Sequence, residues 1–117
     1  MGIRGIGVDI EPVKRFAAKP YPRHRAFYAR LFTEGEIAYC LGKRDPAASF
    51  AGKFCAKEAL LKALRRHNVF DVRAVEIKNN REGEPVAYFR RRKLDCFLSI
   101  AHEGEYAAAF CIVMSPT

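Results

Sequence analysis

The segment at residues 50–64 constrains the fold more than any other, because it predicts a helix that is apolar or small on nearly every side. It contains no proline and consists mainly of strong helix formers. At about 100° per residue, large apolar side chains fall on one face and small side chains lie roughly opposite; these are Phe50, Phe54, Leu61 and Leu64 against Gly52, Ala56, Ala59 and Ala63. The small face suits close packing by a neighbouring element. We expect such a helix in the protein interior.

The same helix carries the charged residues Lys53, Lys57, Glu58 and Lys62. Burying an ionised group without a partner costs on the order of several kcal/mol. We therefore expect each of these charges to meet a partner. A metal ion that carries an anionic ligand would be one economical partner for them.

Length and charge limit the classes of protein to consider. With 117 residues, we expect one domain over residues 1–117. The formal net charge of +8 predicts attraction to nucleic acid, a phosphate-rich small molecule, an anionic membrane or an acidic protein. No stretch approaches the roughly 20 apolar residues that span a membrane, and the N-terminus lacks the apolar run of a signal peptide.

The cysteines favour a reduced, cytoplasmic protein. None of them forms a CxxC pair, and three lie in apolar runs; they are Cys40, Cys55, Cys96 and Cys111. This spacing does not predict a zinc site.

Patterning along the chain predicts an α+β fold, with helices in the middle and hairpin-linked strands at the end. Residues 6–10 alternate as a strand that places Asp9 opposite the isoleucines, and Pro12 suits the first turn of a following helix. Thr33 and Glu36 have capping-box spacing. We expect helices at residues 13–16, 23–32, 33–39 and 47–66, strands at 72–78, 86–89, 97–101 and 106–113, and loops at 43–46, 79–85, 90–93 and 102–105.

Asp9 and Glu58 are carboxylates from distant parts of the chain that could share one hard cation. Magnesium prefers one or two protein carboxylates, with waters and phosphate oxygens completing its shell. The alternative is that Asp9 caps the next helix and Glu58 pairs with Lys62 four residues later. Taken alone, that alternative is favoured, but the predicted burial of the helix shifts the interpretation toward a metal site.

The lysines of this helix are point charges suited to phosphate, and the alternative is that their stems pack while the ammonium groups reach water. Lys62 lies beside Glu58, which favours a functional role, whereas for Lys53 the two interpretations are balanced. His102, at a predicted hairpin turn, could contact a phosphate or transfer a proton, but a plain turn residue is the commoner case. Gly83 likewise suits an ordinary hairpin turn.

Four segments resemble, in order, the motifs of one known family: an opening strand and helix, a second helix start, a signature helix of W/F-x-x-K-E-A/S-x-x-K pattern, and a closing hairpin. They are residues 5–15, 32–37, 50–63 and 98–109. On these motifs the chain resembles the 4′-phosphopantetheinyl transferases and, at this length, their small holo-acyl-carrier-protein synthase group.

The resemblance implies that the 4′-phosphopantetheine arm of coenzyme A is transferred to a serine of apo acyl carrier protein in fatty-acid biosynthesis, with release of adenosine 3′,5′-bisphosphate. It also implies that Asp9 and Glu58 hold Mg²⁺, with Mn²⁺ as an alternative ion, against the pyrophosphate, and that Lys62 neutralises charge there. The positions that it associates with the nucleotide end are Lys53, His102, Ser99 and Gly83. Because the small members form trimers, a homotrimer with each site split between two chains is expected.

The proton acceptor for the serine stays open between Glu58, acting through a metal-bound water, and a water connected to bulk solvent. The surplus positive charge suits an acidic carrier protein, which basic residues near the N-terminus could steer toward the site. They are Lys14, Arg15, Arg23, Arg25 and Arg30.

The sequence departs from the family pattern at three places, which concern carrier and nucleotide contacts and not the metal residues. Pro20 and Pro22 interrupt a region that is helical in familiar members, where the carrier would dock. Residues 65–68 replace a glycine-containing turn, and Ala101 replaces a hydroxyl residue before His102. The metal residues are unaffected.

The alternative function is a non-catalytic basic module that binds nucleic acid or coenzyme A. Its support is the net charge and the basic run at residues 90–93. The sequence contains no recognised nucleic-acid motif, and its aromatic residues fall at core-like positions. Retention of Asp9 and Glu58 argues against a coenzyme A binder without chemistry, so we expect an enzyme with no nucleic-acid partner.

Overall fold

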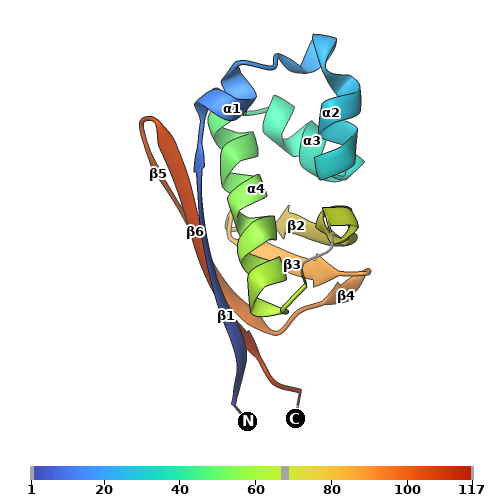
Figure 1. Cartoon of the computed structure of the whole chain (residues 1–117), viewed down its shortest axis with the longest axis vertical. Coiled ribbons are helices and arrows are strands. Elements are labelled where there is room, and N and C mark those ends of the chain that lie inside the picture. Colours follow the sequence, from blue (N-terminus) through green and yellow to red (C-terminus); the bar gives the residue numbers. More distant parts are fainter. Residues whose placement is uncertain (1, 67–68, 117) are drawn as a thin grey trace.

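The long helix α4 (Pro46–Ala63) runs through the centre of the computed structural model, which describes residues 2–66 and 69–116 (Figure 1). Asp45 caps it by accepting a hydrogen bond from the Ala48 backbone N–H at 3.2 Å, and Pro46 occupies its first turn. Most of its residues from Phe50 to Ala63 are buried. The predicted interior helix is therefore confirmed, although it ends earlier than residue 66.

One face of α4 lies against a three-stranded antiparallel sheet in the order β1-β6-β5 (Figure 1). Its strands are β1 (Ile3–Pro12), β6 (Tyr106–Met114) and β5 (Cys96–Glu103). In β1 the odd-numbered residues from Gly5 to Glu11 turn toward α4, and the even-numbered residues from Ile6 to Ile10 are exposed. Asp9 therefore lies opposite the isoleucines, as predicted.

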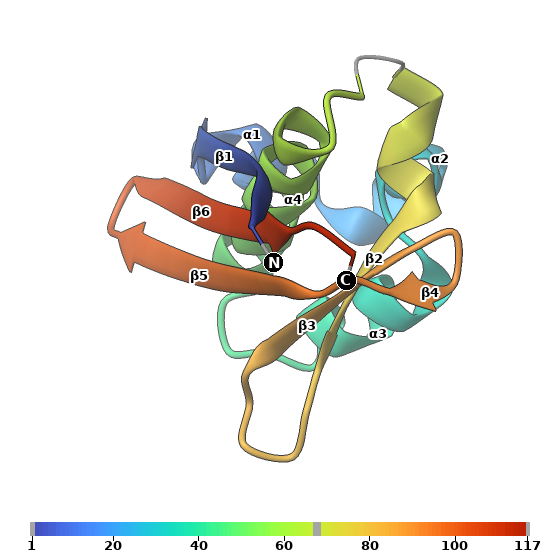
Figure 2. The same cartoon turned by 90° about the horizontal axis from the view of Figure 1, so that it is seen from below.

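The opposite side of α4 is covered by a second antiparallel sheet and by the short helices (Figure 2). The sheet has the order β2-β3-β4, with β2 (Val75–Asn79), β3 (Pro85–Phe89) and β4 (Arg92–Lys93). The helices are α1 (Lys14–Ala17), η1 (Tyr21–Arg23), α2 (Arg25–Leu31), α3 (Glu34–Leu41) and η2 (Val69–Ala74). The molecule is thus an α+β fold of antiparallel strands on a long central helix. Within the described ranges, no helix is long and apolar enough to cross a membrane.

Glycines allow the first sheet to approach the helix backbone closely. A Cβ on Gly5 would lie 2.0 Å from the Ala63 carbonyl oxygen, and one on Gly7 would lie 1.8 Å from that of Ala59. The small face of α4 is therefore the contact for β1. The glycines at 5 and 7 serve this approach.

Several predicted boundaries are wrong. Residues 72–74, expected in a strand, belong to η2, and Pro12 ends β1 instead of opening a helix. β5 extends to Glu103, so His102 lies within a strand and not in the hairpin turn. Arg92 and Lys93, expected in a loop, form β4. Of the segment at residues 65–68, the last two residues lie outside the described part of the chain.

Candidate active site

The packing of β1 on α4 brings Asp9 to Glu58. Gly7 lies against Ala59, and two further strand residues advance by about 6.6 Å while four helix residues span about 6.0 Å. Asp9 therefore comes level with Cys55 and the helix turn that carries Glu58. Burial raises the pKa of Glu58, the nearby Asp9 carboxylate raises it further, and Lys62 and Arg15 oppose the shift. The two predicted metal ligands are thus neighbours.

Lys62 links this pair to β1. Its ammonium group donates to Asp9 Oδ1 at 3.1 Å and to the Val8 carbonyl at 2.9 Å. Among the described residues Glu58 forms no ion pair, so the alternative Glu58–Lys62 pair is not formed. Asp9 is no helix cap either, because Val13 occupies that position of α1 without a side-chain hydrogen bond.

Asp9 Oδ2 is buried and has no hydrogen-bond partner within residues 2–66 and 69–116. Leaving such an oxygen unsatisfied costs about 1–3 kcal/mol, and more when it is charged. A hard cation with oxygen ligands would satisfy it. Across the same residues no three His, Cys, Asp or Glu side chains gather as a metal site. The two carboxylates therefore suit Mg²⁺, whose remaining ligands are commonly water and phosphate oxygens.

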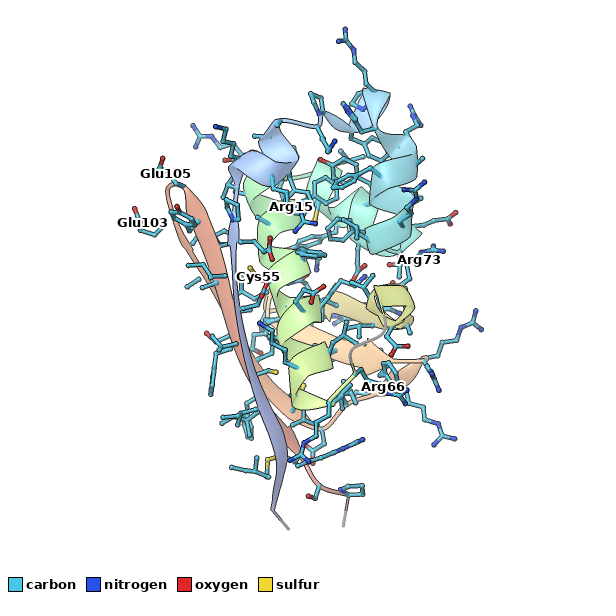
Figure 3. All side chains as sticks on the ribbon, in the orientation of Figure 1. Arg15, Cys55, Arg66, Arg73, Glu103 and Glu105 are labelled. Carbon is cyan, nitrogen blue, oxygen red and sulfur yellow. The ribbon has the colours of Figure 1, made fainter. Side chains whose placement is uncertain are left out.

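Glu11 and Arg15 also lie at the carboxylate site, and neither of them was placed there from the sequence. Glu11 lies two residues after Asp9 on the same strand face, and burial, together with Asp9, raises its pKa against the opposing effect of Arg15. Arg15 pairs with Glu11 at 3.0 Å and lies 4.8 Å above the Phe54 ring. Figure 3 shows Cys55 between α4 and the first sheet, whereas Arg15 lies near the N-terminal part of α4, on the side of the short helices. The two-residue period of the strand would have predicted that Glu11 lies on the same face as Asp9.

The predicted nucleotide residues line one cavity of about 410 Å³ between α4, the β2–β3 hairpin and β5; they are Lys53, His102, Ser99 and Gly83. Gly52 makes room for the His102 ring, since a Cβ there would lie 2.7 Å from His102 Nε2. His102 Nε2 lies 3.0 Å from the Ala48 carbonyl oxygen.

Lys53 does not reach out to water. It is buried, and its ammonium group donates to the Ile77 carbonyl at 3.0 Å and to Asn79 Oδ1 at 2.7 Å. Burial lowers its pKa, while Cys40 and Glu36 oppose the shift. Asn79, which also lines the cavity, was missed because it falls in a predicted turn and nothing local pairs it with α4.

Lys57 is a structural charge. Its side chain and that of Glu36 are fully buried, and their charged atoms lie 2.6 Å apart. Lys57 also donates to the Leu31 carbonyl at 2.7 Å, and Glu36 accepts from the Ile77 N–H at 2.7 Å. The partner that the sequence predicted for this lysine charge is therefore a carboxylate on α3, and a metal-bound anion is not needed.

The carboxylate site and the cavity lie at opposite edges of one sheet. Asp9 pairs with Ala109, and Ala109 pairs with Ile100 on β5. Two strand spacings separate these edges by about 10 Å. Neither Asp9 nor Glu58 lines the cavity that holds Lys53 and His102, so the described residues form two separate sites.

The basic residues predicted to receive a carrier protein are all exposed, and they lie on α1, η1 and α2 at one end of the molecule (Figure 1). They are Lys14, Arg15, Arg23, Arg25 and Arg30. The carboxylate site opens beside them, since Arg15 contacts both Glu11 and Phe54.

Comparisons with known proteins converge on one family. The model of the 4′-phosphopantetheinyl transferase superfamily matches residues 5–111. The holo-[acyl-carrier-protein] synthase of Thermodesulfovibrio yellowstonii is 35% identical over 111 residues, covering 95% of this chain and 98% of that protein. That of Chlorobium limicola is 41% identical over 115 residues, covering 92% and 91%.

Solved structures of such synthases share the fold. A holo-(acyl-carrier-protein) synthase from Bacillus anthracis, in complex with CoA (3′,5′-ADP), superposes with a TM-score of 0.83 at 28% identity, covering 99% of this chain and all of the other. The synthase from Neisseria meningitidis gives 0.81 at 25% identity, covering 97% and 99%.

Proposed function

The chain belongs to the 4′-phosphopantetheinyl transferase superfamily, as a transferase of the holo-[acyl-carrier-protein] synthase type, and from this premise we propose the following reaction. The enzyme moves the 4′-phosphopantetheine arm of coenzyme A to a serine hydroxyl of an apo acyl carrier protein. Adenosine 3′,5′-bisphosphate leaves. The serine oxygen forms a bond to the phosphorus next to the pantetheine arm, the bond to the bridging pyrophosphate oxygen breaks, and the serine proton is released.

We propose that Asp9 and Glu58 hold Mg²⁺, with Mn²⁺ as an alternative ion. The unpartnered, buried Asp9 Oδ2 supports this assignment. So does the pKa of Glu58, which burial and Asp9 raise, because a cation would relieve both causes. When bound, the ion would supply charge neutralisation and orientation for the pyrophosphate.

We propose that Lys62 also neutralises the negative charge of the pyrophosphate. Its ammonium group lies at the Asp9 carboxylate while its side chain is 51% exposed, so it can reach a phosphate without crossing the core. Phosphoryl transfer spreads negative charge over oxygens, and catalysis is mainly positioning and electrostatic stabilisation. The serine proton would pass to Glu58 through a water molecule or to a water connected to bulk solvent.

The nucleotide end of coenzyme A is assigned to the cavity lined by Lys53, His102, Ser99 and Gly83. This cavity and the carboxylate site lie at opposite sheet edges, which supports an active site completed by a second protomer. The outer face of the sheet supplies an apolar surface for that contact. Ile6, Val8, Ile10 and Phe97 are each at least 60% exposed there. We therefore propose a homotrimer with sites between subunits.

We further propose that the carrier is an acidic acyl carrier protein of fatty-acid biosynthesis in the cytoplasm, docked on the basic surface of α1 and α2. Opposite charge steers association and fixes register. The four free cysteines are consistent with a reducing compartment.

The observation that carries this proposal is the convergence of Asp9 and Glu58 beside Lys62. The test incubates the protein with apo carrier protein, coenzyme A and Mg²⁺ and measures the mass gain of the carrier. Asp9→Asn, which keeps the side-chain shape, should abolish transfer while leaving circular dichroism unchanged. It should also remove the Mg²⁺ dependence of coenzyme A binding in calorimetry. Folded wild-type protein that modifies none of several carriers would refute the function.

A further inference from the structure

The turn between β3 and β4 places arginines where the backbone disfavours them. Arg90 and Arg91 have φ angles of 51° and 69°, the left-handed region that two-residue hairpin turns require and that Asn and Gly adopt most easily. Arg92 follows as the first residue of β4. We name these three residues the arginine turn. Arginines at both of these positions carry backbone strain, which directs attention to their guanidinium groups.

The charges of this turn are poorly compensated within the chain. The Arg90 side chain is 61% exposed, and its nearest ion-pair partner, Asp71, lies 3.9 Å away. Within the described residues, Arg91 and Arg92 form no ion pair. Exposed arginines that lack close carboxylate partners are available to an external anion.

A hollow of about 490 Å³ adjoins the turn, and Arg73, Arg90 and Arg91 line it together with Glu34 and Glu76. The two carboxylates oppose the entry of a phosphate backbone, but they can accept N–H donors. A protein chain presents both carboxylates and N–H groups. The mixed lining therefore suits an acidic protein better than a nucleic acid.

The arginine turn lies on the same side of the molecule as α2 (Figures 1 and 2). Arg73 on η2 donates from Nε to the Phe32 carbonyl, directly after α2, at 3.3 Å. Figures 1 and 2 both place α2, η2 and β4 on one side of the molecule, away from the β1-β6-β5 sheet. Figure 3 shows Arg66 and Arg73 on this same side. This side lies away from the apolar sheet face that is proposed as the contact between protomers.

We propose that the arginine turn is a second docking contact for the acidic carrier protein, beyond α1 and α2. This inference rests on the proposed function. Carboxylates of the carrier would pair with the guanidinium groups of Arg90 and Arg91, whose planar forks suit bidentate contact. Its effect is on association and orientation of the carrier and not on the chemical step.

The test uses the double variant Arg90→Asn/Arg91→Gly, which gives the turn its preferred residues while removing both charges. We expect kcat/KM for the carrier to fall about 3- to 10-fold at low salt, as for charges at an interface rim. The KM for coenzyme A and the kcat at saturating carrier should stay unchanged. High salt should shrink the difference, because it screens exposed charges. Arg90→Lys/Arg91→Lys, which keeps both charges but removes the bidentate forks, should restore only part of the lost kcat/KM.

The matched control is Arg81→Asn, which removes one exposed charge from the β2–β3 turn outside the basic side. It should not differ from wild type in the same assay, whereas Arg91→Gly alone should. If the double variant matches wild type while transfer proceeds normally, the docking contact is wrong and the proposed function survives. If it loses only duplex DNA retention, with carrier kinetics intact, the turn serves nucleic acid and our inference is overturned. A wild-type enzyme without transferase activity would refute both.

Discussion

Replacing Gly7 by alanine should disable the active site from a position that touches no substrate. A Cβ at Gly7 would lie 1.8 Å from the Ala59 carbonyl oxygen and 3.1 Å from the Ala63 nitrogen, both of them backbone atoms. The strand and helix would have to separate by about 1.6 Å, the difference between 1.8 Å and an ordinary contact of 3.4 Å. Overpacking of this kind costs about 1–3 kcal/mol. For a chain of this size that corresponds to a melting temperature lower by roughly 4–12 °C.

The separation would also move Asp9, two residues along the same strand, away from Glu58. A misplacement of about 1 Å in a catalytic site can cost about 100-fold in rate. The assay follows carrier modification at a temperature where circular dichroism shows the variant fully folded, together with Mg²⁺-dependent binding of coenzyme A. Gly42→Ala is the control, because its Cβ would make ordinary contacts of 3.5 and 3.6 Å. Wild-type melting temperature and turnover in Gly7→Ala would show that the strand is not held against the helix backbone as argued.

Three further predictions concern charge and assembly. Because burial raises the pKa of Glu58 above its ordinary 4.5, the metal-free protein should lose stability as pH rises through the raised pKa. Glu58→Gln should remove that loss and melt higher than wild type near neutral pH, and parallel melting curves from pH 4 to 8 with chelator would contradict this. Lys57→Met leaves Glu36 charged and unpaired and should cost about 3–5 kcal/mol in urea unfolding, with recovery in the double variant Glu36→Gln/Lys57→Met. Phe110→Glu, on the outer sheet face at 45% exposure, should reduce the molar mass measured by light scattering to that of one chain and abolish transfer; an intact oligomer would place the interface elsewhere.

Local patterns predicted the parts of the fold that depend on neighbours in sequence. The apolar and small faces of the segment around Phe50 predicted an interior helix, and alternation predicted the first strand with Asp9 opposite the isoleucines, while only the structure showed that the face of Asp9 is the inner one. The same reasoning failed at residues 72–74, because three residues are too few to distinguish a strand from a 3₁₀ turn. It also failed at His102, where turn residues nearby hid the end of the strand. Strand ends are set by pairing with a partner strand, here β6, and a single strand carries little information on where that pairing stops.

For the candidate site, the sequence identified the residues but not their partners. Asp9, Glu58 and Lys62 could be named from residue type and motif, because carboxylates and lysines are the groups that such chemistry needs. Their pairing could not be named, since Glu58 and Lys62 have favourable helix spacing and yet Lys62 joins Asp9, 53 residues away. The buried Lys57–Glu36 pair was hidden for the same reason.

The sequence by itself determined the helix with its charges, the strand that places Asp9 opposite the isoleucines, and the family. Only the tertiary structure decided which charge meets which. Ion pairs are selected by the distances that remain after strand β1 has settled on the backbone of α4, and those distances arise from contacts between residues far apart along the chain.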